Sequence, residues 1–74
     1  MNRKTMQSVD CSTRRKRKAA LACSIYILEQ ISLGEVAYRD NMPLNFQNSD
    51  AYDNTDYCIC LIEEAIDVLR SVYE

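Results

Sequence analysis

The scarcity of chain-breaking residues is the strongest constraint on the fold, because the 74 residues include a single glycine, Gly34, and a single proline, Pro43. Strands joined by tight turns need more of these residues, whereas long helices do not. Hydrophobic residues make up 47% of the chain and charged residues 27%, a balance typical of a folded globular protein. We therefore expect an all-α protein.

The first predicted helix covers about residues 13–33. Ser12 or Thr13 can cap its start, because a hydroxyl can accept a hydrogen bond from a free amide of the first turn. No breaker follows before Gly34, which is the candidate stop. Alternatively the helix resumes or continues through Val36, Ala37 and Tyr38, since an interior glycine costs only about 1 kcal/mol relative to alanine. Apolar side chains occupy almost every side of this helix after its first turns, so we expect more than one neighbouring helix to cover it.

The second predicted helix covers about residues 54–73, with Asn54 or Thr55 as its cap. Its apolar side is roughly twice as wide as the ~100° stripe of an ordinary surface helix. One partner helix cannot cover a surface of that width.

The segment between the two helices is expected to be a long loop or to contain a short helix. Residues 39–53 lack a helical period and are rich in Asn, Asp and Ser around Pro43. Leu44 and Phe46 are the residues that could fix this loop to the core. Connections in helical bundles usually have about 2 to 8 residues, so additional structure or a functional loop is expected here.

We predict two long antiparallel helices that complete a helical bundle by homodimerisation about a two-fold axis. A core of this size usually supplies only about 3 to 5 kcal/mol, which also favours a second copy. The competing solution is a third helix, drawn from residues 35–52, that packs within one chain. The candidate self-association residues are Leu21, Ile25, Leu28, Leu61, Ile62, Leu69 and Val72.

Charge is distributed very unevenly along the chain. Residues 1–18 contain seven of the nine cations and one of the eleven acidic residues, although the net charge of the whole chain is −2. We divide the chain into a flexible basic arm, residues 1–11, and a single helical domain, residues 12–74. Such a split indicates an anionic partner for the basic end or charge matching within the fold.

A run of five cations begins the first predicted helix. One interpretation is contact with the phosphates of a nucleic acid, aided by Arg3 and Lys4, or a nuclear-localisation signal if the host is eukaryotic. The other is solvated charge, or neutralisation by Asp67 and Glu74 at the end of the second helix. The run consists of Arg14, Arg15, Lys16, Arg17 and Lys18.

The four cysteines do not have the spacing of a metal site. On a helix, Cys58 and Cys60 point about 200° apart, and Cys11 and Cys23 are widely separated in the sequence. We interpret Cys23 and Cys58 as core residues and Cys60 as an exposed thiol. The acidic segment 50–56 lacks the pattern of a calcium-binding loop, so we expect no metal and no cofactor.

The expected location is the cytoplasm, because no cleavable secretory signal and no run of 18 apolar residues is found in the sequence. We therefore expect reduced thiols and no membrane partner. Histidine is absent, and one glycine cannot form a phosphate-binding loop, so we expect no enzymatic activity.

The leading hypothesis is a small homo-oligomeric protein-interaction module, of the regulator or inhibitor type, that covers a surface of another macromolecule. Its partner would meet the loop near residues 39–46 or an acidic face formed by Glu63, Glu64, Asp67 and Glu74. The alternative is a nucleic-acid-binding accessory protein that uses the basic run at residues 14–18.

Overall fold

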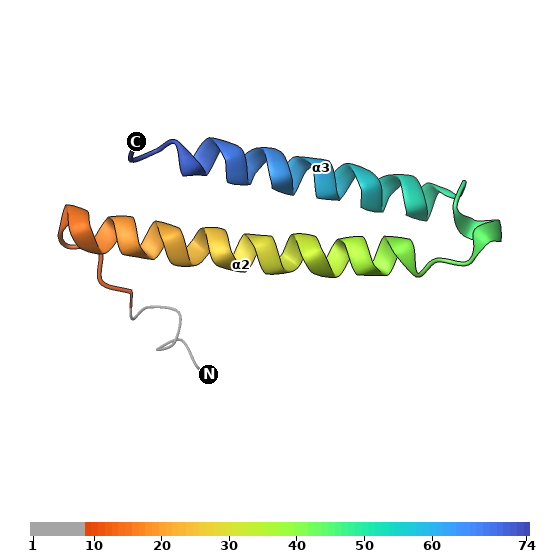
Figure 1. Ribbon diagram of the computed structural model, residues 1–74, viewed down its shortest axis with the longest axis horizontal. Coiled ribbons are helices and arrows are strands. Elements are labelled where there is room, and N and C mark those ends of the chain that lie inside the picture. Colours follow the sequence, from red (N-terminus) through yellow and green to blue (C-terminus); the bar gives the residue numbers. More distant parts are fainter. Residues whose placement is uncertain (1–8) are drawn as a thin grey trace.

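The computed structural model describes residues 9–74, which form an antiparallel helical hairpin (Figure 1). The long helices are α2 (Arg14–Asp40) and α3 (Asp50–Arg70), and the segment between them contains a short 3-10 helix, η1 (Leu44–Phe46). No strand occurs in this part of the chain. The predicted all-α fold with two long antiparallel helices is confirmed, whereas its dimerisation stays a prediction.

Helix α2 begins where the sequence indicated but ends later. Thr13 caps it, since its Oγ1 accepts a hydrogen bond from the Lys16 amide at 3.1 Å. The predicted stop at Gly34 is wrong and the alternative, continuation past this glycine, is confirmed, because the helix runs through Gly34 to Asp40. Gly34 has no positive φ, and an interior glycine costs a helix only about 1 kcal/mol relative to alanine.

Helix α3 begins earlier than predicted. Ser49 is its N-cap, and its hydroxyl accepts a hydrogen bond from the Tyr52 amide at 3.2 Å. Asp50 and Asp53 then lie in the first turn, where the positive end of the helix dipole favours carboxylates. Thr55, a predicted cap, is instead a buried residue inside the helix.

The connection between the helices packs less closely than predicted. Leu44 is 84% exposed and Phe46 is 52% exposed, so the expectation that they fix the loop to the core is wrong. The loop is held by polar contacts instead, including a hydrogen bond from Gln47 Nε2 to the Met42 carbonyl at 3.4 Å. Within residues 9–74, the competing third long helix does not form.

The two helices pack along a seam in which covered positions alternate at intervals of four and three residues. This spacing is that of a coiled coil, in which it keeps one side of each helix against its partner. The seam positions, all buried or half-buried, are 21, 25, 28, 32, 35 and 39 in α2 and 52, 55, 59, 62, 66 and 69 in α3, followed by 73 just beyond the end of α3.

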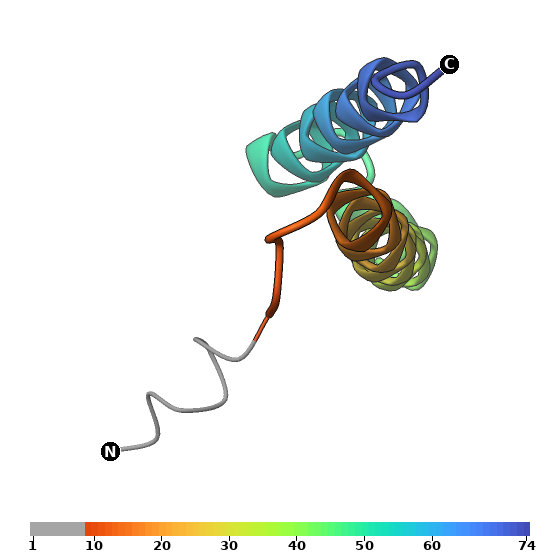
Figure 2. The ribbon, with the colours of Figure 1, turned by 90° about the vertical axis from the view of Figure 1, so that its left-hand side faces the viewer.

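The core of the described hairpin is small. Ile59 and Ile66 are its buried apolar residues, at 4% and 5% exposure, and no large side chain of residues 9–74 is less than 2% exposed. Figure 2, viewed close to the helix axes, shows a single layer of two helices. Each helix therefore has one helical neighbour, although its apolar surface is wide enough for more.

Candidate functional site

The basic run lies in the first turns of α2, at the end of the hairpin that also holds the C-terminus (Figure 1). All five cations are exposed. Arg14 lies over the ring of Tyr73, with its guanidinium carbon 5.0 Å from the ring centroid. Lys16 Nζ lies 2.6 Å from Asp10 Oδ2, and Arg17 Nη1 donates to the Cys11 carbonyl at 3.0 Å.

These contacts leave most of the positive charge of the run uncompensated. Within residues 9–74, the ion pair that involves a cation of the run is the one between Lys16 and Asp10. Asp67, expected as an internal partner, instead lies 3.9 Å from Arg70 of its own helix. Arg3 and Lys4, which could extend the basic surface, lie outside the described residues, as does most of the predicted arm at residues 1–11.

Asp10 is the acidic group most strongly affected by the basic run. Its hydrogen bond with Lys16, followed by those with Ser12, lowers its pKa from 3.8 to about 2. The carboxylate is therefore ionised over a wider pH range and holds the segment before α2 against the first helical turn.

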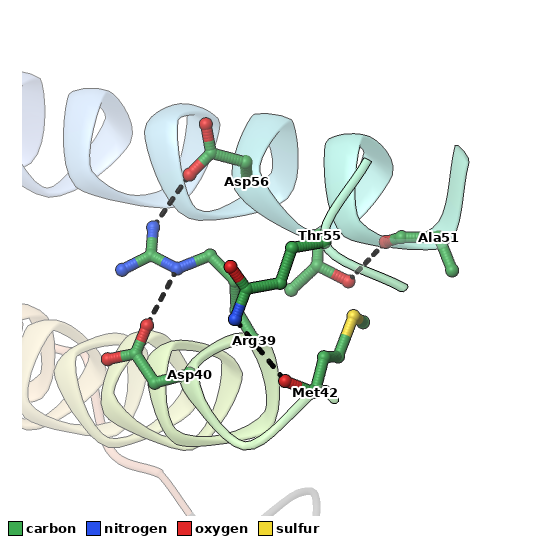
Figure 3. Close-up of polar contacts among 7 residues, drawn as sticks. Arg39, Asp40, Met42, Ala51, Thr55 and Asp56 are labelled. Carbon is green, nitrogen blue, oxygen red and sulfur yellow. Dashed lines mark hydrogen bonds and ion pairs between the residues drawn. The ribbon is translucent and has the colours of Figure 1, made fainter. Parts of the chain in front are cut away.

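A second group of ion pairs lies at the loop end of the hairpin (Figure 3). Arg39 of α2 donates to Asp56 of α3 at 2.6 Å and to Asp40 at 3.1 Å. These hydrogen bonds raise the pKa of Arg39, and the bond with Asp56 makes the largest contribution. The contacts are structural in kind, since they join the two helices beside the loop.

The candidate self-association residues fall into two groups. Five lie half-buried in the seam between the chain's own helices, namely Leu21, Ile25, Leu28, Ile62 and Leu69. Leu61 and Val72 are instead 46% and 53% exposed. Contact with a second copy stays a prediction for both groups.

A wider set of exposed apolar side chains lies one position before the seam in each helix. Each residue of an α-helix is rotated by about 100° from the one before it, so these positions form a second stripe along each helix. The set is between 45% and 61% exposed and comprises Ile27, Ile31, Tyr38, Leu61, Val68 and Val72. We call these six residues the apolar face.

The two stripes of the apolar face lie on the same side of the hairpin. Viewed from one end of the hairpin, successive residues turn in opposite senses in α2 and α3, because the two helices are antiparallel. The seam positions of the two helices also point in opposite directions. Because both are reversed, the position before the seam lies on the same side of the hairpin in both helices. Four members were missed from the sequence: Ile27, Ile31, Tyr38 and Val68. Their signal was a second spacing of four and three residues, offset by one position from the first.

The opposite side of the hairpin is charged along α3, whereas along α2 it also exposes Tyr26 at 60% and Leu33 at 62%. Arg70 of α3 donates a hydrogen bond to Glu29 of α2, and a shallow groove beside this pair is lined by Glu63, Asp67 and Leu33 among others. The predicted partner residues Glu63, Glu64, Asp67 and Glu74 are all exposed. Helical rotation puts Glu63 and Asp67 one position after the seam. We call this side of α3, together with the exposed Glu74 beyond the end of the helix, the charged face.

Two of the cysteines do not lie where they were predicted, whereas Cys60 is exposed as predicted. Cys23 and Cys58 are exposed, so their assignment to the core is wrong, and Cys11 and Cys60 are exposed as well. The described part of the chain contains no group of three or more Cys, Asp or Glu side chains that could hold a metal ion. The absence of a metal or cofactor stays a prediction.

Helix α2 is, by length and composition alone, long and apolar enough to cross a membrane. Within the hairpin, however, it packs along α3, and its central residue Glu29 accepts a hydrogen bond from Arg70. The structure thus gives α2 a protein neighbour along one side.

Comparison of the chain with protein-family models, with curated proteins and with solved structures found no match.

Proposed function

We propose that this chain is a small, non-enzymatic protein-interaction module of the regulator or inhibitor type, which acts as a homodimer in the cytoplasm. The observation that carries the proposal is the apolar face. Six large side chains, each 45% to 61% exposed, lie together on one side of a hairpin whose own seam buries two apolar residues. Contiguous apolar surface of this kind marks a protein-protein contact.

One side of the hairpin is apolar and the other carries exposed carboxylates, which supports a different binding role for each side. The apolar face suits self-association, whereas the charged face remains available to a different macromolecule. Glu63, Asp67 and Glu74 are exposed there, and Glu64 is exposed at the edge of α3. Such carboxylates fit a basic partner surface, which they would attract and orient over a range set by the salt concentration.

Light scattering on the purified chain, at about 100 and 500 mM salt, tests the first part of the proposal. The expected result is twice the mass of one chain, unchanged by a short generic DNA duplex. A monomer at all concentrations would remove the main support.

Affinity capture from the host, with E63Q and D67Q variants compared to the unaltered chain, tests whether the charged face holds a partner.

The alternative function is nucleic-acid binding through the basic run at residues 14–18. It is favoured by one specific observation: Arg15 and Lys18 are exposed and have no ion pair within residues 9–74. Binding would then weaken steeply with salt and be abolished in an R15Q/K18Q variant. If the mass measured by light scattering at about 50 mM salt does not change when the duplex is added, this alternative is excluded.

A further inference from the structure

The apolar face requires a cover, and its chemistry restricts what that cover is. Its two stripes occupy positions 20, 24, 27, 31, 34 and 38 of α2 and 54, 58, 61, 65, 68 and 72 of α3. None of these positions holds Asp, Glu, Lys or Arg. Both stripes repeat at intervals of four and three residues, so the surface can accept two further helices in coiled-coil packing.

Charge divides the hairpin along its length. The end that holds the termini carries the basic run at residues 14–18 and Arg70 against the carboxylates of Asp10, Asp67 and Glu74, which leaves an excess of positive charge. The loop end carries a group of carboxylates against one cation, Arg39. This acidic group consists of Glu35, Asp40, Asp50, Asp53 and Asp56. Each hairpin is therefore positive at one end and negative at the other.

A second hairpin can cover the apolar face in two ways. If both copies run in the same direction, the two basic runs at residues 14–18 lie together and repel each other. If the copies run in opposite directions, the basic end of each lies at the acidic loop end of the other, and both pairs of ends attract. A two-fold axis perpendicular to the helices produces the second arrangement.

We infer that the apolar face is covered by a second copy of this chain in antiparallel orientation, forming a four-helix bundle in which each basic end contacts the partner's acidic loop end. The inference rests on the self-association in the proposed function and adds the surface and the orientation. The seam residues Ile59 and Ile66 then become the centre of a core that is covered on a further side.

The native cysteines allow a direct measurement of orientation. Cys11 lies at the terminal end of the hairpin and Cys23 nearer the middle of α2, and both are exposed. Two full-length variants, each retaining one of these cysteines with the other three replaced by Ser or Ala, are spin-labelled and examined by pulsed electron paramagnetic resonance. The distance measured is that between the two labels of one dimer.

The expected Cys11–Cys11 distance is about 40 Å, since α2 has 27 residues and an α-helix rises ~1.5 Å per residue. The expected Cys23–Cys23 distance is shorter, roughly 20 Å, because this site lies near the symmetry axis. A Cys11 distance that is short and similar to the Cys23 distance, or below it, would show a parallel dimer and overturn the inferred orientation, while leaving the proposed self-association intact. A monomer without any inter-chain distance would overturn both.

A pair of matched variants tests the surface. Ile31→Glu, on the apolar face, is expected to weaken the dimer by about 100-fold or more, since two unpaired carboxylates would be buried. Leu33→Glu, at a similarly exposed site on the opposite side, is expected to leave the dimer unchanged. Equal effects of the two variants would overturn the assignment of the face, as would flotation of the unaltered chain, as a monomer, with neutral lipid vesicles.

Salt supplies an independent readout that needs no substitution. Raising the salt concentration from about 0.1 to 0.5 M screens charges, so it is expected to weaken the antiparallel dimer. A parallel dimer would be strengthened, because its like-charged ends would repel less. A dimer that becomes tighter at high salt would therefore contradict the antiparallel orientation.

Discussion

Arg39 Nη1 lies 2.6 Å from Asp56 Oδ1, which joins the last turn of α2 to the second turn of α3 beside the loop (Figure 3). Farther from the loop, Arg70 at the end of α3 makes a corresponding contact with Glu29 near the middle of α2. The two pairs run in opposite directions, with the arginine on α2 in one and on α3 in the other. Together the two ion pairs favour one axial alignment of the helices along the seam. Apolar contacts alone would specify this alignment less strictly.

Removing Arg39 is expected to loosen the loop end of the hairpin. Arg39→Ala should lower the melting temperature, and the effect should shrink at high salt because the pair is screened. The raised pKa of Arg39 means that its contribution is fully present below its ordinary pKa and is lost only as the pH rises above that value. Circular dichroism melts measure both effects. Arg39→Lys, which keeps the charge, should lose less, and an equal loss would assign the effect to packing of the longer side chain.

The small core makes the hairpin sensitive to single cavities. Ile59 is 4% exposed, so Ile59→Val should cost about 0.5 to 1.5 kcal/mol and Ile59→Ala about 2 to 5 kcal/mol of unfolding free energy. The larger loss is comparable to the whole stability expected of a core this size. Urea denaturation followed by circular dichroism measures it. Leu33→Ala, at a site 62% exposed, is the control and should change stability by less than about 0.5 kcal/mol.

Gly34 is a site where added side-chain volume should stabilise α2. A Cβ at this position would meet no atom within 4 Å, and φ is not positive there. Gly34→Ala is therefore expected to raise the unfolding free energy by about 0.5 to 1 kcal/mol, because alanine loses less backbone entropy in a helix. Thermal melts at several protein concentrations measure it. Position 34 also belongs to the stripe that the inferred dimer covers, so the gain is expected for the single hairpin at low protein concentration. A loss of stability at low concentration would contradict the prediction, whereas a loss that appears only at high concentration would indicate close approach of the second copy.

The carboxyl group of Asp10 should titrate well below ordinary aspartates. Its pKa is lowered to about 2, so its contact with Lys16 is complete above 3.8 and is lost as the pH falls towards 2. Carbon-13 NMR titration of the side-chain carboxyl measures the midpoint. Lys16→Ala removes the first cause of the shift and should return the midpoint towards 3.8, whereas Arg15→Ala, next to it, should have little effect.

The two side-chain caps should each contribute to the start of their helix. Ser49→Ala and Thr13→Ala both leave a first-turn amide without its hydroxyl acceptor, so each is expected to cost about 1 kcal/mol. Asn48→Ala, beside Ser49 but outside the helix, is the control. Equal stability of Ser49→Ala and Asn48→Ala, measured by urea denaturation, would show that α3 does not depend on this cap.

Local sequence signals predicted the existence of both helices but were less successful with their boundaries. Gly34 resembled a helix end, yet a helix can pass through glycine when packing on both sides offsets its cost, and α2 packs against α3 beyond it. Ser49, Asn54 and Thr55 are all favourable caps by residue type. The choice of Ser49 depends on where the chain returns from the loop, which no local signal contains.

The sequence by itself determined that the chain is all-α, with two antiparallel helices and a basic end, because breakers, helical period and charge order are properties of neighbouring residues. The tertiary structure decided which apolar residues serve the hairpin and which remain exposed. Ile62 lies in the seam and Leu61, beside it, is 46% exposed. An apolar arc wider than one partner helix allows several rotations of the helix about its axis. The rotation observed is a property of the pair of helices, in which Ser32 and Thr55 are buried between them while Ile31 and Val68 face outward.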